Sequence, residues 1–217
     1  MRWLARKLKP GSLTPEAGSW HDEAKEILAA AKTTGEIPNL KIPSSKEIYA
    51  KAIPSFSQDL IDKYLLFQKE IKIPKRVLYP SPDLDASPVR AFPNSQVVLV
   101  DINPLAVEAL RRSGIEAVCS DIADYKPEQL FDLMILLNPA FVTERANHCV
   151  ETGGHILSNN YHENALQMWN QPKTYEPVAT IFPLREGGDR LIKEIKAEHL
   201  HNQDWAYADL FYLFRKK

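Results

Sequence analysis

Three polar residues suited to ligand binding, Asp101, Asp121 and Asn138, each follow a short apolar run in the middle of the chain. A carboxylate at the end of a buried run is costly unless it accepts hydrogen bonds, and two hydroxyl groups of a sugar can satisfy its two oxygens. The alternatives are structural: Asp101 would cap the helix that begins at Pro104, and Asp121 would form an ordinary turn.

The segments that must position these residues alternate between strands and helices. Asn103 and Pro104 predict the start of a helix that ends at Gly114, and a short helix is expected around residues 126–130. Strands are predicted at 77–79, 97–100, 117–119 and 132–137. This succession predicts a parallel sheet with right-handed crossovers. Ligands bind beyond the carboxyl ends of such strands, where the three polar residues fall.

The flanking segments extend this pattern on both sides. The pair Gly153–Gly154 is expected to turn the chain into a fifth strand, and residues 190–195 fit a helix or a strand. The other predicted elements are helices at 20–32, 45–52, 57–71, 143–150 and 163–169, and strands at 155–158, 177–182 and 207–214. We therefore divide the chain into an N-terminal helical arm, residues 1–73, and an α/β domain, residues 74–217.

The central motifs resemble those of class I S-adenosylmethionine-dependent methyltransferases. The resemblance is carried by Val97–Asp101 and the helix after it, by Ser120–Ile122 and by Phe131–Pro139, and it extends from about Arg76 to the C-terminus. It implies a Rossmann-like α/β fold: a mostly parallel seven-stranded sheet with helices on both faces, an antiparallel last strand, and here an N-terminal helical extension.

The resemblance also implies a cofactor, S-adenosylmethionine, and a role for each strand end. Asp101 would bind the ribose hydroxyls with Ile102 beside the adenine. Asp121, with Ile122 next to it, would contact the adenine amino group. Within the turn after the first strand, the implied cofactor-binding residues are Tyr79, Ser81, Asp83 and Asp85.

That turn departs from the family pattern. One branch carries Tyr-Pro-Gly-Ser-Gly-Phe-Asp-x-Ser-Pro, whereas residues 79–88 read Tyr-Pro-Ser-Pro-Asp-Leu-Asp-Ala-Ser-Pro, so Ser81 and Asp83 replace both glycines. Glycine adopts positive φ and lets the backbone approach a ligand, whereas Pro82 also removes a donor. Two hypotheses follow: the turn has been re-tuned and still binds cofactor, or the protein is a catalytically inactive binding module.

The end of the fourth strand resembles a substrate motif. Asn138-Pro139-Ala140-Phe141 is similar to the Asn-Pro-Pro-Tyr/Phe motif of methyltransferases that act on amino groups, with Ala140 in place of the second proline. The resemblance assigns the catalytic end of the site to Asn138, Pro139 and Phe141, where amide and carbonyl oxygens accept hydrogen bonds from the target nitrogen. The alternative is a turn that merely ends the strand.

Composition limits the partners. A net charge of -1 gives no general attraction to nucleic acid or to an anionic membrane. Two cysteines without a CxxC motif and six histidines without ligand spacing indicate neither a disulfide framework nor a metal site. The chain has no apolar run long enough to cross a bilayer. We expect a cytoplasmic protein.

The sequence thus predicts an S-adenosylmethionine-dependent methyltransferase with an unidentified small-molecule or protein acceptor, no membrane partner, and nucleic acid as a less favoured partner. The binding module is the alternative. An NAD-linked oxidoreductase is disfavoured because no GxGxxG motif follows the first strand.

Overall fold

The computed structural model describes residues 44–139, 141–184, 187–201 and 210–217, so the helix predicted at 20–32 lies outside the described residues. The chain divides into two compact units, Met1–Glu47 and Ile48–Lys217. The predicted boundary between residues 73 and 74 stays a prediction. In the described ranges, no helix is both long enough and apolar enough to cross a membrane.

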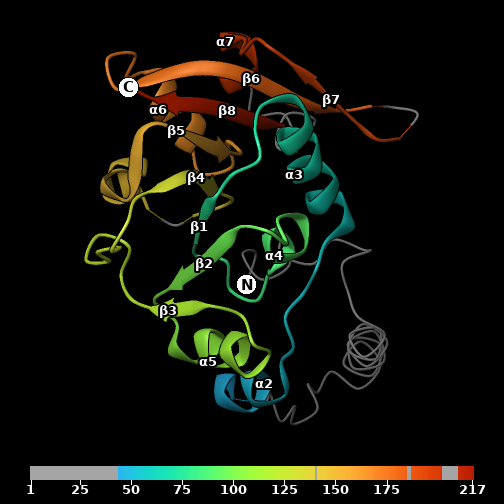
Figure 1. Ribbon diagram of the computed structural model, residues 1–217, viewed down its shortest axis with the longest axis vertical. Helices are drawn as coiled ribbons and strands as arrows, with labels where there is room; N and C mark the ends of the chain where they lie inside the picture. Colours follow the sequence, from blue (N-terminus) through green and yellow to red (C-terminus); the bar gives the residue numbers. More distant parts are fainter. Residues whose placement is uncertain (1–43, 140, 185–186, 202–209) are drawn as a thin grey trace, which may run out of the picture. The chain divides into compact units, whose positions relative to one another are not determined.

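Most predicted elements are present with shifts of a few residues at their ends (Figure 1). Before the central strands come α2 (Ser45–Lys51) and α3 (Gln58–Glu70). The central part contains β1 (Arg76–Pro80), α4 (Ser87–Ala91), β2 (Gln96–Asp101), α5 (Pro104–Arg112), β3 (Ala117–Cys119) and β4 (Phe131–Leu136). It is followed by a 3-10 helix η2 (Thr143–Cys149), β5 (Val150–Ser158), α6 (Asn164–Trp169), β6 (Tyr175–Pro183), β7 (Asp189–Ile192), α7 (Ala197–His201) and β8 (Phe211–Lys216).

The second unit is built on one sheet in the order β3-β2-β1-β4-β5-β8-β6-β7. The first five strands in this order pair in parallel, and β8 pairs antiparallel with both β5 and β6. The antiparallel last strand is therefore confirmed. The mostly parallel seven-stranded sheet is wrong, because the sheet is mixed and has eight strands. The additional strand is β7, which pairs antiparallel with β6 after a turn through Gly187 and Gly188.

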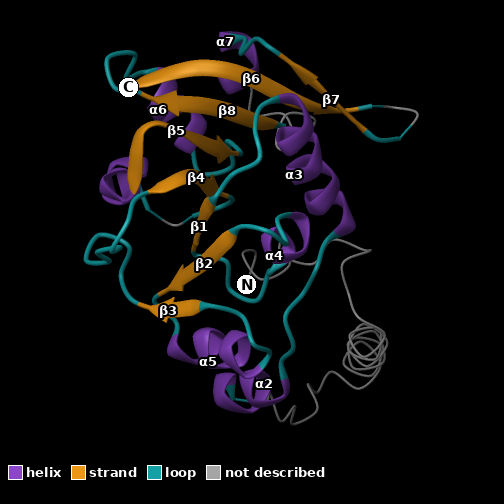
Figure 2. Ribbon diagram, in the orientation of Figure 1, coloured by secondary structure: helices purple, strands orange, loops and turns teal. Residues whose placement is uncertain are grey.

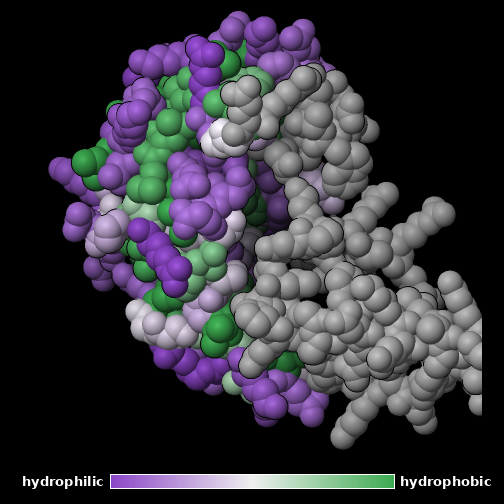
Figure 3. All heavy atoms as spheres, turned by 90° about the vertical axis from the view of Figure 1, so that its right-hand side faces the viewer, coloured by the Kyte–Doolittle hydropathy of each residue, from purple (hydrophilic) through white to green (hydrophobic). Residues whose placement is uncertain are grey.

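Alternate residues of the central strands enter two separate apolar clusters. Val77 and Leu99 belong to one cluster together with residues of α3, α4 and α5. Leu78 and Val98 belong to the other, with residues of η2, α6 and α7. Since successive side chains of a strand point to opposite faces, the helices cover both faces of the sheet, as predicted (Figure 2). The face in Figure 3 shows apolar side chains interspersed with hydrophilic ones.

The helix ends follow the local sequence signals. Ser57 caps α3 by accepting a hydrogen bond from the Leu60 N–H, and Asn103 caps α5 by accepting one from the Leu105 N–H. Gly114, expected at the end of α5, has a φ of +77°. A polar side chain that accepts such a bond stabilises a helix by about 1 kcal/mol. The cap therefore fixes where α5 begins, directly after the carboxylate of Asp101.

Two local predictions are wrong. Residues 126–130 contain no helix. The pair Gly153–Gly154 does not turn the chain into β5 but lies inside it, because the strand begins at Val150 and shifts register against β4. A Cβ on Gly154 would lie 2.9 Å from the Glu151 carbonyl oxygen, so the glycine is needed for the close passage of the backbone.

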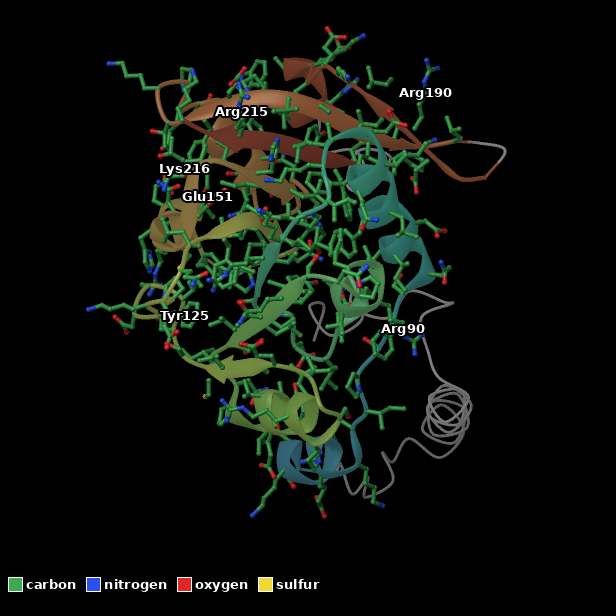
Figure 4. All side chains as sticks on the ribbon, viewed as in Figure 1. Arg90, Tyr125, Glu151, Arg190, Arg215 and Lys216 are labelled. Atoms are coloured by element: carbon green, nitrogen blue, oxygen red, sulfur yellow. The ribbon has the colours of Figure 1, made fainter. Side chains whose placement is uncertain are left out.

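The end of β8 is tied to the beginning of β5. Figure 4 shows Lys216 close to the beginning of β5, and its Nζ donates hydrogen bonds to the carbonyl oxygens of Asn147 and Val150 at 2.9 and 2.7 Å. These carbonyls belong to the last turn of η2 and the first residue of β5. The bonds hold the amino end of β5, which lies opposite the carboxyl ends of the parallel strands.

Candidate functional site

The polar residues lie where the strand order reverses. From β1 the chain proceeds outward through β2 and β3 on one side, and it then returns to β4 and β5 on the other. In open parallel sheets the crevice at such a point, beyond the carboxyl ends of the strands, is where ligands bind. The turn after β1 and the residues after β2, β4 and β5 therefore form the candidate site.

The turn after β1 keeps the backbone conformation of glycine without the glycines. Ser81 has a φ of +55° and Asp83 a φ of +54°, a region that residues with a Cβ rarely adopt. The Ser81 N–H donates to the Val100 carbonyl oxygen at 2.8 Å. The Asp83 N–H donates to Oδ2 of Asp101 at 3.0 Å. The turn thus has the shape expected of the family motif, but two of its N–H groups are used within the protein.

Asp101 holds the turn and the start of α5 together. Its Oδ2 accepts from the Asp83 N–H, and its Oδ1 accepts from the Asn103 N–H at 2.8 Å. The residue is only 9% exposed. Each carboxylate oxygen has a second acceptor position, so the two bonds leave capacity for two hydroxyl donors. The adjacent Ile102 is 69% exposed, so its apolar side chain is accessible next to Asp101.

Asp83 has a partner that the sequence did not suggest. The Tyr49 hydroxyl donates to Oδ1 of Asp83 at 2.5 Å. Burial, together with this hydrogen bond and the negative charges of Asp83 and Asp101, raises the pKa of Tyr49 above its usual value. Tyr49 therefore stays protonated and acts as a hydrogen-bond donor to Asp83 in the turn. Arg112, through a bond of 2.8 Å to the Tyr49 carbonyl oxygen, holds the backbone there.

Asp85 stabilises the turn through hydrogen bonds with Ser87 and Tyr79. Its Oδ1 accepts from the Ser87 N–H and hydroxyl, and its Oδ2 accepts from the Tyr79 hydroxyl at 3.0 Å. Burial raises the pKa of Asp85, which the bonds from Ser87 and Tyr79 partly oppose. Tyr79 itself is buried, with a raised pKa caused by burial and by the charge of Asp85. These two residues shape the turn through contacts within the protein.

Asp121 pairs with a cation. Its Oδ2 lies 2.7 Å from Nη2 of Arg145 in η2, and its Oδ1 accepts from the Ala123 N–H at 2.9 Å. The side chain of Asp121 is 31% exposed. Ile122, by contrast, is buried in the cluster beneath the helices of one face. Asp121 therefore links the end of β3 to the segment after β4.

Asn138, at the end of β4, forms two hydrogen bonds with Asn159, at the end of β5. Oδ1 of Asn159 accepts from the Asn138 N–H at 3.2 Å, and Nδ2 of Asn159 donates to Oδ1 of Asn138 at 2.7 Å. Asn138 is exposed and has a φ of +51°. Pro139 is buried, and Phe141 packs against the core while its carbonyl oxygen accepts from Nδ2 of Asn164 at 3.0 Å.

The structure thus joins the predicted residues into groups. Asp83 and Asp101 form one hydrogen-bonded group, Ser81 is bonded to Val100 of the neighbouring strand, and Asn138 forms a further group with Asn159. Sequence reasoning missed Tyr49 and Arg145 as members of the site, and it gave Asn159 no role. Asn159 directly follows a predicted strand, which is a usable signal, whereas nothing near Tyr49 or Arg145 in the sequence indicates a role. Among the residues that the structure describes, no three His, Cys, Asp or Glu side chains are arranged to hold a metal ion.

Comparisons with known proteins identify the fold. No family model and no curated protein sequence matches the chain. Among solved structures, the chain is similar to the N-methyltransferase NodS from Bradyrhizobium japonicum WM9, with a TM-score of 0.52 and 13% identity, over 73% of this chain and 95% of that chain. The NodS complex with S-adenosyl-L-homocysteine gives the same TM-score and identity over 80% of this chain and 93% of that one. The chain has the class I methyltransferase fold, as the resemblance implied.

Proposed function

We propose that the protein is an S-adenosylmethionine-dependent methyltransferase that acts on a small-molecule or protein acceptor. The observation that carries the proposal is the left-handed backbone at Ser81 and Asp83, which is bonded to β2 through Val100 and Asp101. Both glycines of the motif are replaced, yet the strained shape that they would make easy is kept. Strain of this kind costs free energy and persists at sites where it serves a function.

The residues at the edge of the sheet fit the nucleoside half of the cofactor. Asp101 has acceptor capacity for the ribose hydroxyls, and exposed Ile102 offers an apolar surface for the adenine. Asp121 would accept a hydrogen bond from the adenine amino group beside its ion pair with Arg145. When bound, S-adenosylmethionine supplies a methyl group activated by a sulfonium. The chain's own residues would hold and orient the acceptor beside it, which is where much of the rate in such reactions arises.

A binding module without catalysis is the second candidate, and the turn favours it in one respect. The N–H groups of Ser81 and Asp83 are used within the protein, and Pro82 has none. The methionine half of a cofactor would therefore meet side chains instead of free amides. Tyr49 already occupies Oδ1 of Asp83. In this function the protein would bind a nucleoside or a partner without transferring a methyl group.

Isothermal titration with S-adenosylhomocysteine tests the proposal. We expect binding by the natural protein, and an affinity at least about tenfold lower, or about 1.4 kcal/mol, in Asp101→Ala, because charge-assisted hydrogen bonds to the ribose are lost. Asp124→Ala, which removes an exposed carboxylate of the same region, is the control and should bind normally. Absence of binding in the natural protein would refute the proposal, and equal binding in Asp101→Ala would remove that residue from the site.

The charge and the cysteines of the chain bear on its partners and its cellular location. A net charge of -1 favours an acceptor other than nucleic acid or a membrane surface. The cysteines Cys119 and Cys149 are unpaired, with Cys119 exposed. An exposed free thiol is suited to a reducing compartment, so we place the protein in the cytoplasm.

A further inference from the structure

We propose that Asn159 is a positioning residue, which fixes the carboxamide of Asn138 in one orientation so that its oxygen can accept a hydrogen bond from a ligand. This inference rests on the proposed function, because the ligand would lie where the methyl group is transferred. It concerns a residue to which the motif resemblance gives no role.

The orientation of both amides follows from a single backbone donor. The Asn138 N–H can only donate, so the Asn159 atom that faces it must be the amide oxygen. Nδ2 of Asn159 is then the atom 2.7 Å from the Asn138 side chain, and because it donates, the atom that it meets must be Oδ1. The flip of each side chain, which is ordinarily an open choice, is therefore determined here by the main chain.

Asn159 is itself held firmly. It is 7% exposed. Its N–H donates to the Leu136 carbonyl oxygen at 3.3 Å, and its carbonyl oxygen accepts from the Ser158 hydroxyl at 2.7 Å. A side chain on such a fixed backbone loses little freedom when it forms two further bonds. Asn159 is therefore suited to impose a geometry on its neighbour.

Asn138 has a conformation that needs this support. Its φ of +51° lies in the left-handed region, although the residue before a proline prefers an extended backbone. Asparagine tolerates the left-handed region better than most residues, and the bond from its N–H to Asn159 holds it there. Asn138 is also exposed, whereas Asn159 is buried. The oriented amide of Asn138 therefore lies at the surface, and the residue that holds it, Asn159, is buried.

The pair has a consequence for recognition. Oδ1 of Asn138 uses one acceptor position for Asn159 and retains a second. We infer that this position faces the ligand and selects groups that donate a hydrogen bond. If Asn138 were released to flip, its NH₂ group would face the same ligand and repel a donor. Asn159 therefore sets the chemical preference of Asn138, not only its place.

The test compares two cofactor analogues. Sinefungin has an amine-bearing carbon in place of the methylated sulfonium, whereas S-adenosylhomocysteine has a thioether sulfur with no methyl or amino group. Asn159→Asp keeps the acceptor for the Asn138 N–H but removes the donor, so the Asn138 side chain should flip. We expect the affinity for sinefungin to fall about tenfold relative to that for S-adenosylhomocysteine, as for the loss of a charge-assisted bond. The carboxylate introduced at position 159 would attract the amino group of sinefungin, so its charge would oppose the expected fall in affinity and cannot cause it.

Asn160→Asp is the matched control. Asn160 also forms two bonds, from its Nδ2 to the Leu200 carbonyl oxygen and to its Oδ1 from the Leu166 N–H, so the change removes the same kind of donor and adds the same charge. Its ratio of affinities should equal that of the natural protein. A fall in the ratio in both variants, or in neither, overturns the positioning role.

A second measurement needs no ligand and covers the case in which Asn159→Asp does not fold. In protein labelled with ¹⁵N-asparagine, the side-chain amide of Asn159 should exchange slowly with solvent, and this protection should be lost in Asn138→Ala. Unprotected exchange in the natural protein overturns the inference. If the natural protein binds neither analogue, the proposed function fails together with the role. Binding with an unchanged ratio in Asn159→Asp refutes the positioning role alone.

Discussion

Replacement of Ser81 by glycine should stabilise the protein. Ser81 has a φ of +55°, and its N–H is held by the Val100 carbonyl oxygen at 2.8 Å, so the residue cannot relax without breaking the bond between the turn and β2. Left-handed backbone costs a residue with a Cβ about 1–2 kcal/mol. Glycine avoids this cost, but it destabilises the folded state by about 0.5–1 kcal/mol because the unfolded chain gains conformational freedom. We expect a net gain of about 0.5–1 kcal/mol in the free energy of unfolding.

Thermal unfolding followed by circular dichroism measures this gain. For a domain of this size it corresponds to a rise in Tm of about 1–4 °C. Ser81→Ala is the matched control, because it removes the hydroxyl but keeps the Cβ and therefore the strain. A lower Tm in Ser81→Gly, or an equal rise in Ser81→Ala, would refute the reasoning from backbone strain.

Asp83→Gly distinguishes strain from side-chain contacts within the same turn. The φ of Asp83 is +54°, so the relief of strain should be similar. The change also removes the acceptor of the Tyr49 hydroxyl. A hydrogen bond of this kind contributes about 1 kcal/mol, which cancels the gain. A Tm close to that of the natural protein is therefore expected for Asp83→Gly, in contrast to Ser81→Gly.

Two further predictions concern parts of the fold outside the site. Burial, reinforced by two nearby cations, lowers the pKa of His155 from 6.5 to about 4. Between pH 6.5 and about pH 4, His155 is therefore protonated in the unfolded chain but stays neutral in the folded protein, and the free energy of unfolding falls as the pH drops through this interval. After allowance for screening of the partly exposed ring, the contribution is about 1–2 kcal/mol. Urea unfolding at pH 7 and pH 4.5 should show that His155→Gln loses correspondingly less stability than the natural protein, whereas His162→Gln behaves like it. Asp132 accepts the N–H groups of Lys75 and Arg76 at 2.9 to 3.1 Å, so Asp132→Asn should lower the free energy of unfolding by about 2 kcal/mol, and a loss below about 0.5 kcal/mol would contradict a structural role.

The sequence by itself determined the central elements of the fold. Buried parallel strands need continuous apolar runs, so β1, β2 and β4 are visible as such runs. Asn103 with Pro104 marks the start of α5 because capping is a local interaction. The position of Asp101 at a strand end follows from the same pattern. Each of these signals depends on residues close together in the chain, which is why sequence reasoning is sufficient for them.

Only the tertiary structure decided the eighth strand and the partners within the site. The sequence of residues 190–195 suits a helix or a strand, and pairing with β6 makes residues 189–192 a strand. The left-handed backbone at Ser81 is not a preference of serine but is imposed by bonds to β2. Asn159 and Tyr49 meet Asn138 and Asp83 across separations of 21 and 34 residues. Such contacts depend on which strands and loops become neighbours, and that is settled by burial of the whole sheet and not by any local sequence.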